Sequence, residues 1–580
     1  MKKLYISLFI LGAFAIFSSC KKGFLDRYPL ADINPEQFFR TVKDLELYTN
    51  SFYNVMPSAE GIYNEDDDNV VKTSLNELLT GNRVVPVSGG GWSWYPLRNI
   101  NYFLENYRKV DIPGAAHYGG VARLFRAIFY FDKVSSFGDV PWYGGVIDIQ
   151  DSSLLNRPRD PRTLVMDSVL ADLDFAIANM NSTKSVEKMT KWTALAYKSR
   201  ICLFEGTFRK YHTEFNLPGA DKFLAEAAEA AEELINSGTY DIYTSTPQTA
   251  YLELFSSMSA QDKEVILTRR FSSDLQIWHN VNYYTITASY GRPGLEKKLV
   301  NSYLLQDGSR FTDQADFNTI PFAEEVQNRD PRLSQTIRTP GYTRIGSTTK
   351  LPPDFTGTIT GYQLIKFVTS TNEDSYNRSH NDMPVMRYAE VLLNFAEAKA
   401  ELGTLTQADI DKSIKLLRDR VAMPNMNLAA ANANPDPYLA GQYKQVAGAN
   451  KGVILEIRRE RRIELVMESF RRNDLMRWKE GHLYTEQFKG MYFAGVGPYD
   501  LDGDGTTDVY IYTGTKPTEK GPQYLKLGSE ILLENGTNGG LILVNPQIAK
   551  KFDETRDYLN PIPVQERQLN PALDQNPNWE

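Results

Sequence analysis

The chain has 580 residues, of which 42% are hydrophobic and 23% charged, a composition typical of an ordinary globular protein with room for a large core. Its formal net charge is −8, from 64 basic and 72 acidic residues, which argues against a nucleic-acid partner because phosphates require a basic surface. The sequence contains no glycine-rich nucleotide-binding loop, and its five histidines are scattered without the spacing of zinc ligands.

The N-terminus has the features of a bacterial lipoprotein leader. Lys2 and Lys3 precede a 14-residue apolar run from Leu4 to Phe17. This run is shorter than the ~20 residues of a transmembrane helix and is typical of a secretory signal peptide. Small residues then stand directly before Cys20, which predicts a signal peptide at residues 1–19 and acylation of Cys20. The alternative is an ordinary signal peptide that happens to end near a cysteine.

Cysteine usage agrees with an exported chain that has no disulfide framework. The sequence contains only Cys20 and Cys202. Cys202 lies in a helical pattern beside Ile201, Leu203 and Phe204, which indicates a small buried hydrophobic residue. Acyl chains on Cys20 would anchor the chain firmly, because each buried methylene contributes ~0.8 kcal/mol.

Helical periodicity dominates the first part of the mature chain, approximately residues 36–240. Helices are predicted within 99–137, 188–206 and 222–240. Between the first two, four apolar residues recur on one helical face: Val165, Val169, Leu173 and Ile177. Alanine-rich helices joined by short turns are typical of tetratricopeptide-like packing, although the spacing here is not a regular repeat.

A glycine-rich loop interrupts this helical region and carries the first candidate binding residues. Residues 81–91 contain the glycines, and Trp92, Trp94 and Tyr95 follow them directly. Exposed aromatic rings on such a loop suit stacking against the faces of sugars. The alternative, given equal weight, is a loop packed onto the helical body.

Residues 241–383 have less helical character and are rich in polar and aromatic side chains. The segment 262–271 alternates like a strand, and Trp278, Tyr283, Tyr284 and Tyr290 follow it without helical period. The candidate ligand-binding residues are drawn from this region and from the glycine-rich loop. They comprise four stacking rings and two polar partners: Trp92, Trp94, Trp278, Tyr284, Arg83 and Asn101.

Helical patterns resume over approximately residues 384–481 and end in a highly charged stretch. In Val453–Gly481, Ile463, Val466, Met467 and Phe470 fall at i, i+3, i+4 and i+7, which predicts one apolar stripe on a helix. The same stretch has dense charges of alternating sign, and Glu468 with Arg472 has helix-stabilising spacing. A cationic ligand site would cluster one sign, so a central helix held by arginine–carboxylate pairs is favoured.

Two acidic stretches are candidates for solvent exposure or for metal binding. Glu65 to Asp68 predict a solvated loop, with calcium as a remote alternative. The second stretch matches positions 1, 3, 5, 7 and 9 of an EF-hand-like loop: Asp500, Asp502, Asp504, Thr506 and Asp508. Gly505 stands at position 6, but Ile511 replaces the bidentate glutamate of position 12. A structural calcium ion is predicted, and a plain hairpin loop is the alternative.

Several of these segments resemble the SusD/RagB family of surface nutrient-binding lipoproteins. The resemblance lies in LFRAIFYFDKVSSFGDVPWYGG at 124–145, in ERRIELVMESFRRNDLMRWKEG before residue 482, and in the Asn-Pro-rich tail. These motifs occur in the family's order along nearly the whole mature chain. The resemblance implies one SusD-like domain over 20–580. It would be a mainly α, tetratricopeptide-like α-α superhelix with a ligand face around 241–383 and a loop-and-tail region at 482–580.

The resemblance also implies a non-catalytic role at the bacterial outer membrane. The expected protein is lipid-anchored at the cell surface, captures an oligosaccharide, and acts as a lid for a SusC-like TonB-dependent transporter. Three alternatives remain: an oligopeptide-binding member of the same family, a glycoside hydrolase, and a scaffold of helical repeats that binds peptides. A hydrolase would require two carboxylates held ~5–10 Å apart in a cleft, and no motif selects such a pair.

Overall fold

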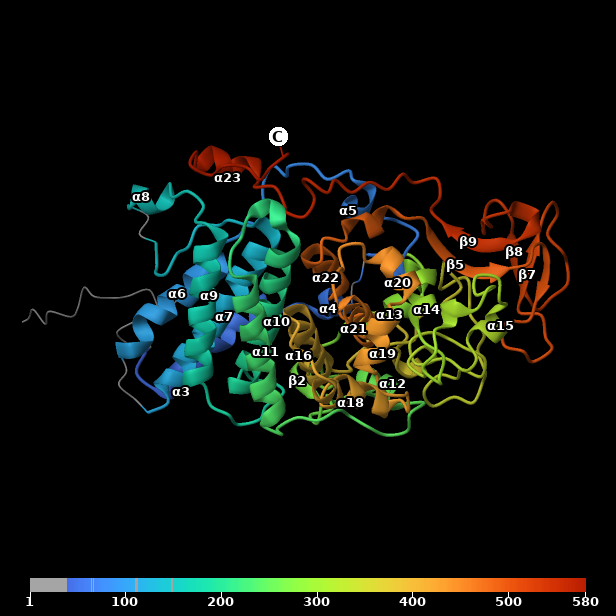
Figure 1. Ribbon diagram of the computed structural model, residues 1–580, viewed down its shortest axis with the longest axis horizontal. Coiled ribbons are helices and arrows are strands. Elements are labelled where there is room, and N and C mark those ends of the chain that lie inside the picture. Colours follow the sequence, from blue (N-terminus) through green and yellow to red (C-terminus); the bar gives the residue numbers. More distant parts are fainter. Residues whose placement is uncertain (1–38, 64, 66, 110–112, 148–149, 580) are drawn as a thin grey trace, which may run out of the picture.

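The computed structural model describes residues 39–579 apart from 64, 66, 110–112 and 148–149 (Figure 1). The predicted signal peptide and Cys20 therefore lie outside the described residues. Within the part of the chain that is described, no helix combines the length and the apolar character needed to span a membrane.

Six long helices form the body of the molecule, and each packs on the next. They are α7 (Ala115–Phe137), α9 (Arg162–Asn179), α10 (Lys191–Tyr211), α11 (Ala220–Asn236), α16 (Tyr388–Leu402) and α21 (Lys451–Glu464). This succession runs from one end of the molecule toward its centre (Figure 1). The predicted tetratricopeptide-like superhelix is confirmed.

Small residues allow these helices to approach closely. Helix α11 packs on both α10 and α16, and most of its buried residues are alanines, with Ala227 and Ala231 fully buried. On α10, a Cβ at Gly206 would lie 2.8 Å from Leu224 Cγ, so any side chain there would force the two helices apart. Cys202 is fully buried in α10, as predicted, and burial raises the pKa of its thiol.

Shorter helices connect and cover this body. They are α3 (Val42–Asn50), α4 (Ala59–Tyr63), α5 (Glu77–Thr80), α6 (Tyr95–Asn106), α8 (Ser152–Leu155), α12 (Ala250–Ser256), α13 (Val281–Ile286), α14 (Lys297–Ser302), α15 (Phe322–Glu325), α17 (Gln407–Asp411), α18 (Ile414–Arg420), α19 (Leu428–Ala433), α20 (Pro437–Gln442), α22 (Arg471–Arg477) and α23 (Val564–Leu569). Most of them lie outside the α7–α11 stack, where the chain is less regular.

The strands are short and form four small sheets. Three are antiparallel pairs: β1 (Val70–Val71) with β3 (Gly294–Leu295), β2 (Val265–Arg269) with β4 (Met383–Arg387), and β5 (Phe488–Phe493) with β9 (Gly540–Val544). The fourth joins β6 (Gly497–Tyr499), β7 (Val509–Tyr512) and β8 (Gln523–Lys526), with β7 in the middle. Strand β2 confirms the strand predicted within 262–271, but Val265 to Thr268 are all buried, so its two faces do not alternate in exposure.

The charged stretch after Val453 does not form the single helix that its spacing predicts. Helix α21 ends at Glu464, and Met467 and Ser469 have φ angles of 63° and 60° before α22 begins. These left-handed residues break the predicted apolar stripe from Ile463 to Phe470. The predicted pairing of Glu468 with Arg472 is also wrong, because Glu468 binds Arg387 and Lys366 instead.

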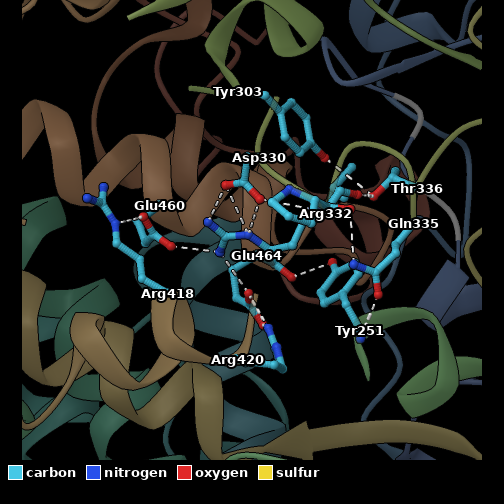
Figure 2. A network of polar contacts seen from close by, with 12 residues as sticks. Tyr251, Tyr303, Asp330, Arg332, Gln335, Thr336, Arg418, Arg420, Glu460 and Glu464 are labelled. Carbon is cyan, nitrogen blue, oxygen red and sulfur yellow. Dashed lines mark hydrogen bonds and ion pairs between the residues drawn. The ribbon is translucent and has the colours of Figure 1, made fainter. Parts of the chain in front are cut away.

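The charges of α21 are nevertheless buried ion pairs, as favoured from the sequence. Arg332 donates to Asp330, Glu460 and Glu464, while Arg420 donates to Glu464 over 2.6 Å (Figure 2). These arginines hold the pKa of the Glu464 carboxyl well below its usual range, despite its complete burial. The cluster stabilises the core and leaves no cationic face for a ligand on this part of α21.

The solvated loop predicted for Glu65 to Asp68 is wrong. Glu65, Asp67 and Asp68 are each buried. Asp68 accepts hydrogen bonds from Arg462 and Arg471, whose positions lie about 400 residues later in the chain. A local run of acids cannot reveal such distant partners, because exposure and pairing depend on the tertiary fold.

The C-terminal tail returns to the first helices and covers them. Val564 donates its backbone N–H to Pro86, and Asn560 donates its own to Ser136 at the end of α7. Asn576 donates its side-chain amide to the carbonyl of Phe137 over 2.9 Å. The last residues thus close the loops that precede α6 and follow α7.

Candidate functional site

A large open cleft lies where the loops around α4 and α6 face α22. Its volume is about 970 Å³. Its lining comes from α6, α7, α10, β4 and α22, and it includes polar, aromatic and charged side chains: Asn54, Tyr95, Asn99, Asp132, Lys133, Arg200, Glu390, Phe470, Arg472 and Asn473. The helical scaffold therefore builds a concavity large enough for several sugar units or a short peptide.

Tyr95 presents the most exposed ring of this lining. It is the first residue of α6, and its side chain is 79% exposed. Pro96 follows it in the first turn, where proline is favoured because a helix start needs no backbone donor there. This rigid helix start holds the ring at the edge of the cleft.

The structure places the two predicted tryptophans of the glycine-rich loop differently from Tyr95. Trp92 is 4% exposed and packs edge-to-face on Phe137, with ring centroids 4.9 Å apart. Trp94 is half-buried and packs edge-to-face on Trp92 and Tyr143. The exposed ring predicted for Trp92 is therefore wrong, and this ring is packed onto α7 as in the alternative, although loop residues 87–91 are exposed.

Asn101, predicted as a polar ligand contact, is a structural residue. Its side chain is 1% exposed, and its amide donates to the carbonyls of Tyr143 and Gly145. Its carbonyl oxygen accepts a hydrogen bond from Arg126. With both ends occupied in the interior, Asn101 holds the 143–145 loop against α6 and does not face the cleft.

Arg83 lies on a second, more polar hollow beside the cleft. This hollow has a volume of about 550 Å³ and shares Ser469, Arg472, Asn473 and Asn560 with the cleft. Arg83 donates to Asn560 over 2.5 Å and stacks on Trp579 with its guanidinium carbon 5.0 Å from the ring. The prediction that Arg83 contacts ligand stays a prediction, now with a hollow beside it.

The floor of this second hollow is acidic. It includes Glu65 and Asp67, and the exposed Glu77 lies on its wall. Asp67 is 2% exposed, and one Oδ accepts from Asn69 N over 2.7 Å. Burial raises the pKa of Glu65 to about 7 and that of Asp67 well above its usual range. A raised pKa favours the protonated carboxyl, which can both donate hydrogen bonds to hydroxyl groups of a ligand and accept hydrogen bonds from them.

Tyr284 lies in a separate aromatic cluster around α13, and Trp278 precedes that helix. Tyr284 stacks on Tyr290 with centroids 4.4 Å apart, and Tyr283 packs against Tyr376, which is 58% exposed. Trp278 is partly exposed, with the guanidinium of Arg378 5.7 Å from its ring centroid. Helix α4 contacts both α13 and the cleft-lining β4, and therefore lies between the two surfaces.

The acids that line the cleft do not form a pair suited to glycoside hydrolysis. Glu390 binds Arg200 over 2.6 Å, Asp474 binds Arg461 and Arg477, and Glu468 binds Arg387. Among the cleft-lining acids of the described chain, this leaves Asp132, whose pKa is raised by burial. A single carboxyl of this kind is a hydrogen-bonding group rather than a two-carboxylate catalytic site.

The Asp500–Asp508 loop forms the hairpin turn between β6 and β7. Carboxylate oxygens of Asp500, Asp502 and Asp504 lie within 4.8 Å of one another. Asp500 also accepts from the N–H groups of Gly503 and Gly505, whose left-handed φ angles of 75° and 87° allow the tight turn. Three hard oxygen donors that converge in such a loop fit calcium chemistry. Asp508 is not part of this group, and its carboxylate accepts a hydrogen bond from Leu501 N.

The sequence alone did not identify Arg472, Asp67 and Asn473 as lining residues of the cleft or the second hollow. Arg472 is exposed, and no ion pair involves it among the described residues, although it lies in a stretch of paired arginines. No local signal distinguishes it from Arg471, which is buried against Asp68. Tyr95 could have been chosen over Trp92, because the Tyr95-Pro96 pair marks a helix start at the surface.

Comparison with known proteins agrees with this architecture. The model of the SusD family matches residues 263–579. A SusD-like protein of Formosa agariphila, P38, is 22% identical over 510 residues, covering 82% of this chain and 91% of that protein. A SusD-like protein of Bacteroides ovatus is 24% identical over 46% of this chain and 50% of its own length.

Solved structures share the fold over almost the full length. A SusD-like protein from Bacteroides fragilis superposes with a TM-score of 0.68 at 18% identity, covering 95% of this chain and all of that one. A SusD-like carbohydrate-binding protein from the same species gives a TM-score of 0.66 at 21% identity, covering 93% and 100%. Since the family model covers more than half of the chain, this protein belongs to the SusD family.

Proposed function

We propose that this protein is a cell-surface, lipid-anchored binding protein that captures an oligosaccharide in the cleft and acts as a lid for a TonB-dependent outer-membrane transporter. The observation that carries the proposal is the lining of the cleft. It joins the exposed ring of Tyr95 to Asn473 and Arg472, which have no ion-pair or hydrogen-bond partner among the described residues. A sugar offers an apolar face and a rim of hydroxyls, which such groups complement.

Two further observations support binding without catalysis. The second hollow continues the cleft and offers carboxyl, amide and guanidinium groups, which hydrogen-bond hydroxyls without requiring a charged ligand. The ionised acids of the cleft are held by arginines, so their role is structural. One relative of known structure is described as a carbohydrate-binding protein, which favours a glycan over an oligopeptide.

The anchor and the partner follow from the sequence rather than from the cleft. Acylation of Cys20 would hold the folded domain at the membrane surface, with residues 20–38 linking the anchor to that domain. A SusC-like transporter would then receive ligand when the domain closes over it. The calcium ion proposed for Asp500, Asp502 and Asp504 would stiffen the β6–β7 hairpin and has no part in binding at the cleft.

Affinity electrophoresis with a panel of polysaccharides tests the proposal. We expect retardation in at least one gel, and we expect Tyr95→Ala to abolish it without changing the melting temperature. Tyr376→Ala is the matched control, because it removes an exposed tyrosine from the α13 cluster instead. Loss of retardation with Tyr376→Ala alone would place the ligand site at the α13 cluster instead. Formation of products from any glycan would favour the glycoside hydrolase alternative.

A further inference from the structure

The small sheet of β6, β7 and β8 carries an aromatic face that the cleft does not use. In the register of the sheet, Pro498 lies beside Tyr510, and Tyr510 lies beside Tyr524. The rings of Tyr510 and Tyr524 are 5.7 Å apart between centroids, and Tyr512 is 6.2 Å from Tyr524. The three tyrosines thus form a continuous strip across the sheet.

The opposite face of this sheet explains why the strip points outward. Val509, Ile511 and Leu525 alternate with the tyrosines and are buried in the protein core. Because side chains alternate between the faces of a sheet, the tyrosines must lie on the other side, where each keeps part of its surface exposed. The core therefore fixes both the position and the orientation of the strip.

Three exposed lysines lie in β8 or in the connection between β7 and β8, in a chain that is acidic as a whole. Residues 509–528 contain Lys516, Lys520 and Lys526 against one acid, Glu519, whereas the full chain has a net charge of −8. None of these lysines forms an ion pair with any described residue, and all three are exposed. Lys516 Nζ lies 5.5 Å from the centre of the Tyr524 ring, so one cation is already beside the stacking surface.

The strip is far from the candidate glycan site. The cleft is lined by α6 and α7, and the β7–β8 sheet lies at the opposite end of the molecule from α6 and α9 (Figure 1). A ligand on the strip would therefore be contacted independently of one in the cleft. A long polysaccharide could engage both, which raises its overall affinity through effective concentration.

We propose that the outer face of β6–β7–β8 is a second binding surface, specific for polysaccharide segments that carry carboxylate or sulfate groups. The tyrosine rings stack on the sugar faces, and Lys516, Lys520 and Lys526 bind the acidic groups along the rim. Exposed charge pairs weaken as salt increases, so this binding is salt-dependent. A neutral chain of the same backbone lacks the contacts to lysine and binds more weakly.

Affinity electrophoresis in polygalacturonate, in its methyl-esterified form and in chondroitin sulfate tests this surface, with calcium present to neutralise the Asp500–Asp508 turn. We expect retardation in at least one of the two acidic gels and less in the esterified one. Tyr510→Ala with Tyr524→Ala, and separately Lys516→Glu with Lys526→Glu, should weaken it by about tenfold or more, the effect of a loss near 1.4 kcal/mol. Tyr524→Phe keeps the ring and should retain binding.

Two controls separate this surface from general charge effects and from the cleft. Lys184→Glu changes an exposed lysine that lies 4.6 Å from the ring of Tyr240 in the helical scaffold, and it should leave retardation unchanged. Tyr95→Ala should likewise leave binding to the acidic gels intact, even where it abolishes binding in the cleft. Absence of retardation in both acidic gels, or equal retardation of the sheet variants and the wild type, overturns the proposal. Equal binding to the esterified polymer would do the same.

Discussion

Arg471 and Asp68 form a two-point ion pair between segments that lie 403 residues apart: Nε donates to Oδ1 and Nη2 donates to Oδ2, each over 2.6 Å. Both side chains are almost completely buried, and Arg462 approaches the same carboxylate at 3.1 Å. This contact attaches the segment before β1 to the junction of α21 and α22, next to Asp67 and Arg472, which line the second hollow.

We expect Asp68→Asn to lower the free energy of unfolding by about 3–5 kcal/mol, because it leaves two buried arginines without their counter-charge. Denaturant unfolding monitored by circular dichroism measures this change. The neighbouring substitution Asp67→Asn is the matched control. It should be neutral or stabilising, since the pKa of Asp67 is raised by burial and by nearby Glu65 and Asp68. Equal destabilisation by both variants would contradict this assignment.

Glu480 should make the protein less stable as the pH rises toward neutrality. Burial raises its pKa to about 7 from 4.5, although Arg458 at 3.5 Å acts in the opposite direction. Between these values the folded state retains a proton that the unfolded state has released, so stability falls with increasing pH. Thermal melts of wild type and Glu480→Gln across pH 4.5–7 should diverge, with the variant losing less stability.

Glu397 should show the reverse dependence. Arg477 donates to it from two nitrogens, and ion pairing with this arginine overcomes burial to lower the pKa of Glu397 to about 2. Its contribution to stability is therefore complete above pH 4.5 and is lost as the pH falls toward 2. Glu397→Gln should be markedly less stable than wild type at pH 7, and the difference should shrink in acid. A constant difference at every pH would show that the charge of Glu397 is not responsible.

Trp92 and Tyr95 should separate stability from binding. Trp92→Ala removes a buried ring and should cost about 3–5 kcal/mol of stability. Tyr95→Ala should leave the melting temperature unchanged and weaken glycan binding by at least about tenfold, which is enough to abolish retardation in the gel. Calorimetric titration and thermal melts on the same two preparations measure both quantities. A stable Trp92→Ala protein that has lost binding would restore the ring stacking that the sequence suggested.

Calcium should bind the Asp500–Asp508 loop weakly. Because Ile511 takes the place of the bidentate glutamate, we expect a dissociation constant of about 10⁻⁴–10⁻³ M, as in extracellular calcium modules. Titration followed by calorimetry should show one site, which Asp502→Asn should remove. Asp307→Asn is the control, because Asp307 also caps an exposed turn through Ser309 but belongs to no group of converging carboxylates in the described part of the chain. Saturation in both variants would assign the ion elsewhere.

Local pattern was sufficient for the scaffold, because its helices are long and periodic. The apolar positions Val165, Val169 and Leu173 do lie on one buried face of α9. Prediction from local pattern failed where the local structure depends on contacts with residues far along the chain. Spacing alone makes Ile463–Phe470 a helix, but the pairing of Glu468 with Arg387 accompanies a break there that no window of sequence contains.

The candidate site was less predictable than the scaffold for a related reason. Three aromatic residues that follow a glycine-rich loop can face the core or the solvent, and packing against Phe137 accompanies the inward orientation of Trp92. Likewise Arg471 and Arg472 are adjacent and chemically identical, yet one is buried against Asp68 and the other lines two hollows. Residue type indicates the chemistry of the site, but tertiary packing determines whether each side chain faces the core or the solvent.

The tail that returns to α7 makes the order of synthesis matter. Asn560 and Asn576 donate hydrogen bonds to the carbonyls of Ser136 and Phe137. The end of α7 therefore completes its contacts only after the C-terminal residues have been synthesised. Contacts of such long sequence separation slow folding, because the intervening chain must be ordered first. During the export proposed above, the early helices would therefore stay loosely packed until the tail is available. The tail would make its contacts with α7 only after the whole domain has crossed the membrane.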